Sequence, residues 1–336
     1  MEQNFSYGAP SPYGDTLQNK FEKKYIRKLG LAVGLAVIIL ALVSRFWSTV
    51  VLWAIDYFGI SHTLAARILE NEGIQQLEQI IFSVLCFTFP FIIAAMAANE
   101  KVSVLIPYKK PKKGTAFPYL LMGISFCTFA NFAVNLAGSF FEDIGVNYEV
   151  TRSPLPTGTV GFLIYLSATA VIPAMVEEFA CRGIVLGLMK PFGEGFAVIA
   201  SSLVFGMVHG NFEQIPFAFL VGLVLGFIRV KTDSMIICMA VHFINNAVSV
   251  VLTYILEANV FPDEAVNTVY LVFMAFALLL GIIGVILIRD KGDLNFEESR
   301  TLSTEKQKFL WFFTSPAIII FVLIELINSS TYFVTG

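Results

Sequence analysis

The sequence predicts an all-α fold, a polytopic transmembrane helical bundle of about eight or nine spans. Of the 336 residues, 57% are hydrophobic and only 14% are charged, and the mean hydropathy is +0.76. These values are typical of membrane proteins. Polar or turn-rich stretches divide the chain into apolar segments, and most of these reach the ~20 residues that a helix needs to cross a bilayer.

Nine segments are the predicted spans. The fourth exceeds one crossing and contains Pro173, so it is expected to project or kink. The shorter fifth and sixth are expected to be tilted or partial. In chain order the segments cover residues 29–55, 76–98, 117–138, 159–188, 195–209, 214–231, 235–256, 267–288 and 309–327.

Charges in the connecting loops predict a cytoplasmic amino terminus. Basic residues precede the first span, whereas the next loop is mainly acidic. Basic residues concentrate in the cytoplasmic loops of membrane proteins, and later loops alternate in the same sense, from the basic 109–113 to the acidic 257–265. Nine spans would then place the carboxyl terminus outside. The basic residues before the first span are Lys20, Lys23, Lys24, Arg27 and Lys28.

Several classes of function find no support in the sequence. The cysteines lie singly in or beside apolar segments without CxxC spacing, and we interpret them as small buried hydrophobic residues. The sequence contains no glycine-rich phosphate loop, no basic stripe interleaved with aromatic residues and no repeat of fixed period. Nucleotide-driven transport and nucleic-acid binding are therefore not expected. The cysteines are Cys86, Cys127, Cys181 and Cys238.

The fourth segment contains two adjacent glutamates and an arginine in "VEEFACRGIV". Each ionisable residue at mid-span costs roughly 2.5 to 3.5 kcal/mol, so these charges need partners. Glu178 and Arg182 are four residues apart, in the favourable order for an ion pair on one helical face. Glu177 points about 100° away and is left free. The alternative explanation is a structural ion pair that locks helices together.

Two of the three histidines also lie in or at the ends of apolar segments. His242 shares a helical face with Asn246, four residues later, and Phe205 precedes His209 by the same spacing. A single histidine in a span is more often a hydrogen-bonded structural residue. Two histidines, a free carboxylate, a carboxylate–arginine pair and an amide on nearby helices are harder to explain by packing alone.

This set of groups suits amide hydrolysis. A carboxylate and an imidazole can share a water, remove its proton and later return that proton to a leaving amine. A second imidazole and an amide can stabilise the oxyanion of a tetrahedral intermediate. Alternatively, Glu177, His209 and His242 could bind zinc, with the other glutamate as base, although the sequence has no H-E-x-x-H pair.

Three motifs in consecutive apolar segments resemble those of a known family. They are "EEFACR" (E-E-x-x-x-R), "FGMVH" (F-x-x-x-H) and "HFINN" (H-x-x-x-N), and the similarity covers roughly residues 118–256. In this order they resemble the CAAX prenyl protease and bacteriocin-processing (CPBP, or Abi) family of intramembrane proteases. The resemblance implies a membrane-embedded peptidase.

The resemblance also implies a role for each motif residue. Glu177 with His209 would activate the attacking water, and His242 with Asn246 would stabilise the oxyanion. The family has been described both as metalloproteases and as metal-independent glutamate-type proteases. The asparagine of the third motif favours the second description, so no cofactor is assigned firmly and zinc stays open. The expected supporting residues are Glu178 and Arg182, which would orient the site, and Phe205, which would pack within its motif.

The chain is accordingly expected to have four parts. A polar amino-terminal tail covers residues 1–28 and lacks the cleavage pattern of a signal peptide. Two spans follow in 29–116, the CPBP/Abi-like catalytic core occupies 117–257, and two further spans lie in 258–336.

The predicted function is that of an endopeptidase in the bacterial cytoplasmic membrane. It would cut a membrane-associated or lipid-anchored peptide or protein, with membrane lipid and this substrate as its partners and no nucleic acid. One alternative is a catalytically inactive family member that acts as an immunity or regulatory scaffold. Another is a proton-coupled transporter, although the repeated halves with interrupted helices that transporters usually have are not evident.

Counting residues from the cytoplasmic ends of the helices places the predicted site residues at different depths in the bilayer. At ~1.5 Å per residue, Glu177 and His242 fall toward the inner half of the bilayer, whereas His209 falls nearer the outer end. The expected pairing of His209 with Glu177 therefore requires a tilted or displaced fifth helix.

Overall fold

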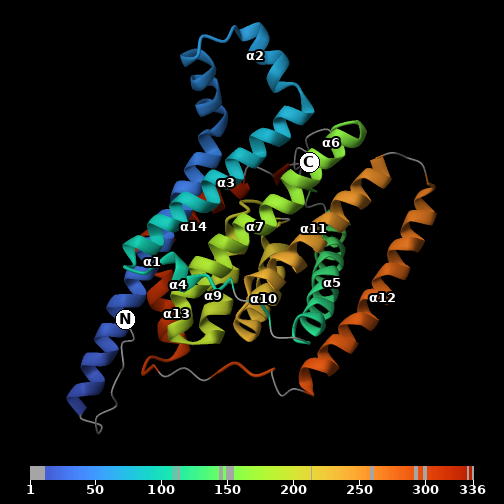
Figure 1. Cartoon of the computed structure of the whole chain (residues 1–336). Helices are drawn as coiled ribbons and strands as arrows, with labels where there is room; N and C mark the ends of the chain where they lie inside the picture. Colours follow the sequence, from blue (N-terminus) through green and yellow to red (C-terminus); the bar gives the residue numbers. More distant parts are fainter. Residues whose placement is uncertain are drawn as a thin grey trace.

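Helices form nearly all of the computed structural model, in agreement with the predicted all-α polytopic bundle (Figure 1). The structure describes residues 12–108, 110–111, 114–143, 147–148, 155–212, 214–257, 261–290, 294–297, 301–330 and 333–334. The α-helices are α1 (Pro12–Tyr57), α2 (His62–Leu69), α3 (Glu72–Ala97), α4 (Val102–Leu105), α5 (Ala116–Asp143), α6 (Gly158–Leu166), α7 (Ile172–Glu178), α8 (Leu186–Met189), α9 (Glu194–Met207), α10 (Gln214–Thr232), α11 (Met235–Glu257), α12 (Asp263–Arg289), α13 (Glu305–Phe313) and α14 (Pro316–Ser330). The other elements are the π-helical η1 (Ser167–Val171) and η2 (Phe179–Val185), the 3₁₀-helical η3 (Lys190–Phe192) and the antiparallel strands β1 (Asn147–Tyr148) and β2 (Phe333–Val334).

Seven helices in the described part of the chain are long and apolar enough to cross a membrane, and α13 with α14 would add an eighth if this pair, bent by 70°, is one broken span. The protein is therefore an integral membrane protein. The predicted fifth span, 195–209, corresponds to α9, which has only 14 residues and is too short for a full crossing. The apparent depth of His209 rested on counting this segment as a complete span.

The first helix begins within residues 1–28, the segment predicted to be a polar tail. α1 begins at Pro12, so residues 12–28 are helical, and residues 1–11 lie outside the described part of the chain. The polar stretch is helical because it packs against the rest of the protein. The buried Glu22 carboxylate accepts hydrogen bonds from the backbone N–H groups of Leu302 (3.1 Å) and Ser303 (3.0 Å) and from the Ser303 hydroxyl.

α1 packs on the last helix, α14, although the two are far apart in the sequence (Figure 1). A Cβ atom on Gly30 would lie 2.6 Å from the carbonyl oxygen of Phe312, at the end of α13, and one on Gly34 would lie 2.6 Å from Cβ of Ala317 in α14. These separations are shorter than any side chain permits. Glycine at both positions therefore allows the close approach, as is common between membrane helices.

The fourth predicted segment is one unbroken helical stretch, Gly158–Phe192, that contains two π-helical segments. Segment η1 ends just before Pro173. In a regular α-helix the carbonyl of Thr169 would accept a bond from the N–H of residue 173, which proline lacks. The side chain of Asn246 on α11 instead donates to this carbonyl at 3.0 Å. The expected kink is thus replaced by a local change of helical pitch.

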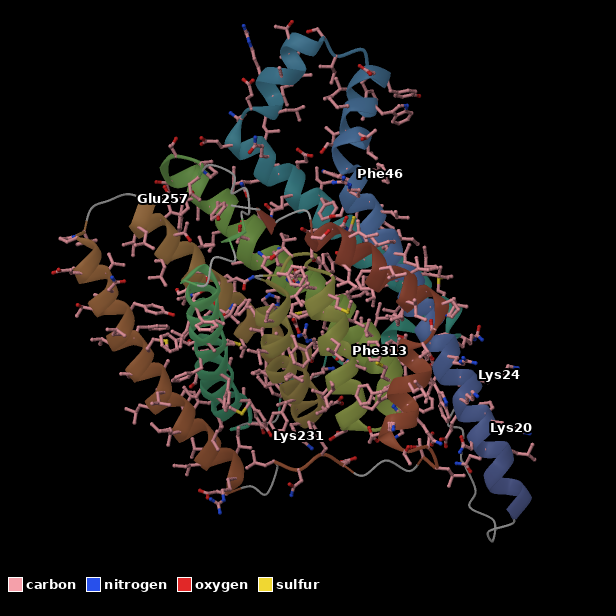
Figure 2. The ribbon with its side chains drawn as sticks, turned by 180° about the vertical axis from the view of Figure 1, so that it is seen from behind. Lys20, Lys24, Phe46, Lys231, Glu257 and Phe313 are labelled. Atoms are coloured by element: carbon pink, nitrogen blue, oxygen red, sulfur yellow. The ribbon has the colours of Figure 1, made fainter. Side chains whose placement is uncertain are left out.

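Basic and acidic residues lie toward different ends of the helical bundle. Figure 2 shows Lys20, Lys24 and Lys231 at one end and Glu257 toward the other. This separation fits the charge rule that predicts a cytoplasmic amino terminus, and the orientation itself stays a prediction. The chain between α12 and α13 crosses the basic end, where Lys231 Nζ contacts both the Glu194 carboxylate (2.9 Å) and the backbone carbonyl of residue 295 (2.6 Å).

All four cysteines are buried and free, as the sequence predicted. Two clusters of apolar side chains form the interior of the bundle. The larger joins α1, α3, η2, α8, α9, α13 and α14, and the smaller joins α5, α10 and α11. The charged residues of the motifs lie where α7 and η2 meet α9 and α11.

Candidate active site

A buried ion pair lies at the junction of α7 and η2. Arg182 Nη1 is 3.1 Å from Glu178 Oε1, and both residues are 0% exposed. They are one helical turn apart, and the helix continues through them, so the local fold holds them in register. The predicted Glu178–Arg182 pair is confirmed.

His242 of α11 joins this pair from a separate helix. Its Nδ1 lies 2.9 Å from the same Glu178 Oε1, and its Nε2 lies 3.8 Å from Glu177 Oε2. A carboxylate oxygen accepts hydrogen bonds, so Nδ1 carries the proton and Nε2 faces Glu177. The imidazole is therefore held between the two adjacent glutamates, with one ring nitrogen on each.

Phe205 of α9 packs against three of the motif residues at once. Its ring centroid is 5.0 Å from that of His209 and 6.1 Å from that of His242, both in edge-to-face geometry. The guanidinium carbon of Arg182 lies 4.1 Å from the Phe205 centroid, a cation–π contact. One buried aromatic ring thus brings residues of all three motifs together.

His209 lies in the turn that follows α9. Its Nδ1 is 2.8 Å from the carbonyl oxygen of Phe205, which can only accept, so Nδ1 donates and Nε2 is left as an acceptor. Within the described residues no ion pair joins His209 to Glu177; the imidazole that approaches Glu177 belongs to His242. The predicted joint action of Glu177 and His209 on one water molecule does not require a direct contact, and it stays a prediction.

Asn246 uses both its amide nitrogen and its amide oxygen in hydrogen bonds with the protein. Its Nδ2 donates to the Thr169 carbonyl at 3.0 Å, and its Oδ1 accepts from Asn245 Nδ2 at 3.0 Å. Asn245 Oδ1 in turn accepts from Asn131 Nδ2 of α5 at 3.0 Å. The amide predicted to stabilise an oxyanion therefore ties α11 to η1 in this structure.

The zinc alternative can be compared with the donor geometry. It requires Glu177, His209 and His242 to converge on one point. Among the residues that the structure describes, no group of three histidine, cysteine, aspartate or glutamate side chains is placed to hold a metal ion. These three donors, as arranged, do not fit a zinc ion, and no catalytic step is derived through one.

Two residues outside the three motifs also meet the His209 turn. Ser329 Oγ of α14 donates to the Gly210 carbonyl at 3.0 Å. A Cβ atom on Gly210, whose φ is +66°, would lie 2.8 Å from Oε2 of the buried Glu325. Glu325 was not among the predicted site residues, although it is a carboxylate within an apolar segment, as Glu177 is.

Comparisons with known proteins agree with the three motifs. Residues 159–248 match the family model described as type II CAAX prenyl endopeptidase Rce1-like, and this range contains every predicted site residue. The chain is also 22% identical over 256 residues to the membrane-embedded CAAX protease MroQ of Staphylococcus aureus (strain USA300), an alignment that covers 69% of this chain and 99% of that protein. No solved structure matches the chain.

Proposed function

We propose, from the family-model match over residues 159–248 and the similarity to a membrane-embedded CAAX protease, that the chain is an intramembrane endopeptidase of the CAAX prenyl protease and bacteriocin-processing family. It hydrolyses a peptide bond in a membrane-associated or lipid-anchored peptide or protein. The observation that supports this proposal best is the position of His242, bonded to Glu178 on one side and facing Glu177 on the other.

In the proposed mechanism both ring nitrogens of His242 act as donors, because one lies 2.9 Å from Glu178 Oε1 and the other 3.8 Å from Glu177 Oε2. In this form Nδ1–H donates to Glu178, and Nε2–H is available to an oxygen atom beside Glu177.

Hydrolysis then proceeds by general acid–base catalysis. Glu177 removes a proton from a water molecule, and the water oxygen attacks the carbonyl carbon of the scissile bond. The carbonyl oxygen becomes negative and accepts a hydrogen bond from His242 Nε2–H. Glu177 returns the proton to the amide nitrogen as the C–N bond breaks, which releases a carboxylic acid and an amine.

The other motif residues assist these groups. His209 Nε2, with Nδ1–H held on the Phe205 carbonyl, is an acceptor for the second hydrogen of the attacking water. Glu178 fixes the orientation of the His242 ring, and Arg182 offsets the charge of Glu178. Asn246, one turn after His242, acts as a positioning residue because its amide is bonded to η1.

The test uses the purified full-length protein in lipid nanodiscs, a library of membrane peptides, and mass spectrometry of the products. Glu177→Gln and His242→Ala are each expected to slow cleavage by on the order of 10² to 10⁴, the range for loss of a general base or an oxyanion donor. The exposed Glu70→Gln is the matched control and should cleave like the wild type.

Two results would contradict this proposal. If Glu177→Gln and His242→Ala gave the wild-type set of products, the cluster would not be catalytic and a non-catalytic scaffold would be favoured. If chelators abolished cleavage and zinc restored it, Glu177, His209 and His242 would have to converge on a metal in the working enzyme, contrary to the metal-independent steps given above.

A further inference from the structure

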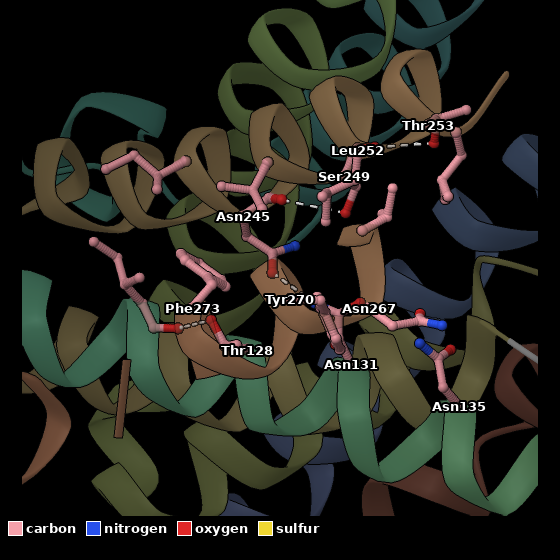
Figure 3. Close-up of a pocket in the computed structure, with 15 residues that line it drawn as sticks. Thr128, Asn131, Asn135, Asn245, Ser249, Leu252, Thr253, Asn267, Tyr270 and Phe273 are labelled. Carbon is pink, nitrogen blue, oxygen red and sulfur yellow. Dashed lines mark hydrogen bonds between the residues drawn. The ribbon is translucent and has the colours of Figure 1, made fainter. Parts of the chain in front are cut away.

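A polar cavity of about 510 Å³ lies between α5, α11 and α12 (Figure 3). Its volume falls within the range of roughly 300 to 1,000 Å³ that is usual for small-ligand sites. Apolar side chains form much of the wall, and amide and hydroxyl groups project between them. The polar residues on which the argument depends are Asn131 and Asn135 of α5, Asn245 and Ser249 of α11, and Asn267 and Tyr270 of α12.

The amides of this cavity are not all used by the fold. Asn131 and Asn245 bond to each other at 3.0 Å. The side chains of Asn135 and Asn267, in contrast, have no hydrogen-bond partner among the described residues, and both are exposed. A side-chain amide that lines a cavity and has no protein partner is available to a ligand. Two such amides, on α5 and α12, face this cavity.

Among the described residues, no charged side chain lines the cavity. Recognition of an anionic lipid headgroup requires lysine or arginine, and a bound cation requires carboxylates. Asparagine offers two N–H donors and one carbonyl acceptor, the same groups that a peptide backbone presents. A peptide segment that is not helical inside the membrane must find such partners in the protein, since lipid supplies none.

We propose that this cavity binds an uncharged, unwound segment of the peptide substrate, with the asparagine amides pairing to its backbone. The proposal rests on the endopeptidase function given above and names a substrate-binding site for it. The apolar wall, which includes Leu252 and Phe273, contacts the side chains of the same segment.

The cavity and the catalytic cluster are connected through α11. Asn245 lines the cavity, whereas the next residue, Asn246, bonds to η1 beside the cluster. To reach both the cavity and the catalytic cluster, a peptide must pass around α11. A helix is about 10 Å across. Extended chain covers roughly 3.3 Å per residue, so the bound segment begins about three or more residues from the scissile bond.

The experiment uses photo-crosslinking to the full-length protein in nanodiscs. The probe is a short peptide of leucine, alanine and serine, blocked at both ends, with one photoreactive benzoylphenylalanine. A second probe has the same sequence with N-methylated backbone amides. Labelled sites are mapped by mass spectrometry. Asn267→Leu removes an exposed amide, and the neighbouring exposed Thr268→Leu, which does not line the cavity, is its matched control.

The labels are expected on α5, α11 and α12. Asn267→Leu should lower labelling roughly fivefold, the effect of losing one hydrogen bond of about 1 kcal/mol, and Thr268→Leu should leave it unchanged. N-methylation should lower labelling of the wild type in the same way. Glu177→Gln should bind the probe normally, so that failure of catalysis and failure of this site are distinguishable.

Three outcomes would overturn the proposal. Labels could fall evenly on all lipid-facing helices, or Asn267→Leu and N-methylation could leave labelling unchanged. In the third case, a photoreactive zwitterionic phospholipid would label the cavity and the peptide would not displace it, which would assign the cavity to lipid.

Discussion

Arg182 is completely buried but has a single ion-pair partner in the protein. Its Nε and Nη2 have no hydrogen-bond partner among the described protein atoms, and its guanidinium lies on the Phe205 ring. A buried ion pair often stabilises a protein less than apolar residues of similar volume would. The Glu178–Arg182 pair is therefore better explained by its effect on His242, which shares the Glu178 oxygen, than by stability.

A double-mutant cycle on this pair separates the two effects. Glu178→Gln leaves Arg182 as an unpaired buried charge and should destabilise the protein by about 3 to 5 kcal/mol. Glu178→Gln with Arg182→Met removes both charges and should recover most of that loss in a detergent-denaturation measurement. Cleavage should stay low in both variants, because His242 has lost the carboxylate that orients it. Wild-type activity in the double variant would show that Glu178 has no role in the site.

The sequence predicts those residue contacts that lie within one helix. Glu178 and Arg182 are four positions apart, and helical geometry alone sets their distance. The bond between Glu178 and His242 joins residues 64 positions apart and depends on how α7 and α11 pack. Spacing carries no information on that packing. For this reason the motifs pointed to Glu178 and His242 as site residues, but they did not predict that the two are bonded to each other.

At the scale of elements, the π-helical segments η1 and η2 flank the short α7 that carries both glutamates. A π-helical turn changes the direction of the side chains that follow it, and such turns are frequent at functional sites. Pro173 removes a backbone donor at this place, and Asn246 supplies the missing hydrogen bond from α11. The geometry of the site thus depends on one proline and one amide on different helices.

Asn246→Ala should therefore destabilise the wild-type protein by about 0.5 to 1.5 kcal/mol, the net contribution of the hydrogen bond to the Thr169 carbonyl. With Pro173→Ala in place, the backbone N–H of residue 173 can bond to Thr169, and the same substitution should cost much less. Equilibrium denaturation in mixed micelles measures both values. Ser167→Ala, which removes a bond within its own helix, is the control and should cost the same in both backgrounds. An equal cost of Asn246→Ala in both backgrounds would contradict the explanation.

Hydropathy predicted most of the long spans and missed where helices stop or bend. The segment 309–327 looked like one span, but α13 ends at Phe313 and α14 begins at Pro316, with a bend of 70°. Proline lacks the N–H that would continue the helix, and averaging over a window of apolar neighbours hides it. The helix over residues 12–28 was not predicted from the sequence, because the partners of its buried Glu22 lie far along the chain.

At the scale of the whole molecule, the last helix reaches the turn that carries a motif histidine. α14 lies outside the region 159–248 that matches the family model, yet Ser329 and Glu325 pack on Gly210, next to His209. Gly210 is suited to this place because its φ of +66° and its lack of Cβ are both required. The sequence showed a carboxylate in the last segment but could not indicate which turn it would meet, because that depends on how all the helices pack.

Gly210→Ala and Gly59→Ala form a matched pair. Both glycines have nearly the same φ, +66° and +67°, and each substitution should cost about 1 to 2 kcal/mol for the left-handed backbone. A Cβ on Gly59 meets nothing within 4 Å, so Gly59→Ala should keep full activity. A Cβ on Gly210 meets Glu325, so Gly210→Ala should shift His209 and lower kcat with little change in KM. Adding Glu325→Ala should restore part of kcat, and equal kcat values for the two glycine variants would refute the coupling.

The packing of α1 on α14 has a consequence for biosynthesis. The ribosome makes Gly30 about 280 residues before Phe312, the residue whose backbone it contacts. At about 5 to 20 residues per second, the first helix waits in the membrane for roughly 15 to 60 s with its glycine face uncovered. Insertion of the core must therefore be complete before the two ends of the polypeptide join. A nascent chain released before α14 is made would expose this face to other membrane proteins and to quality-control proteases.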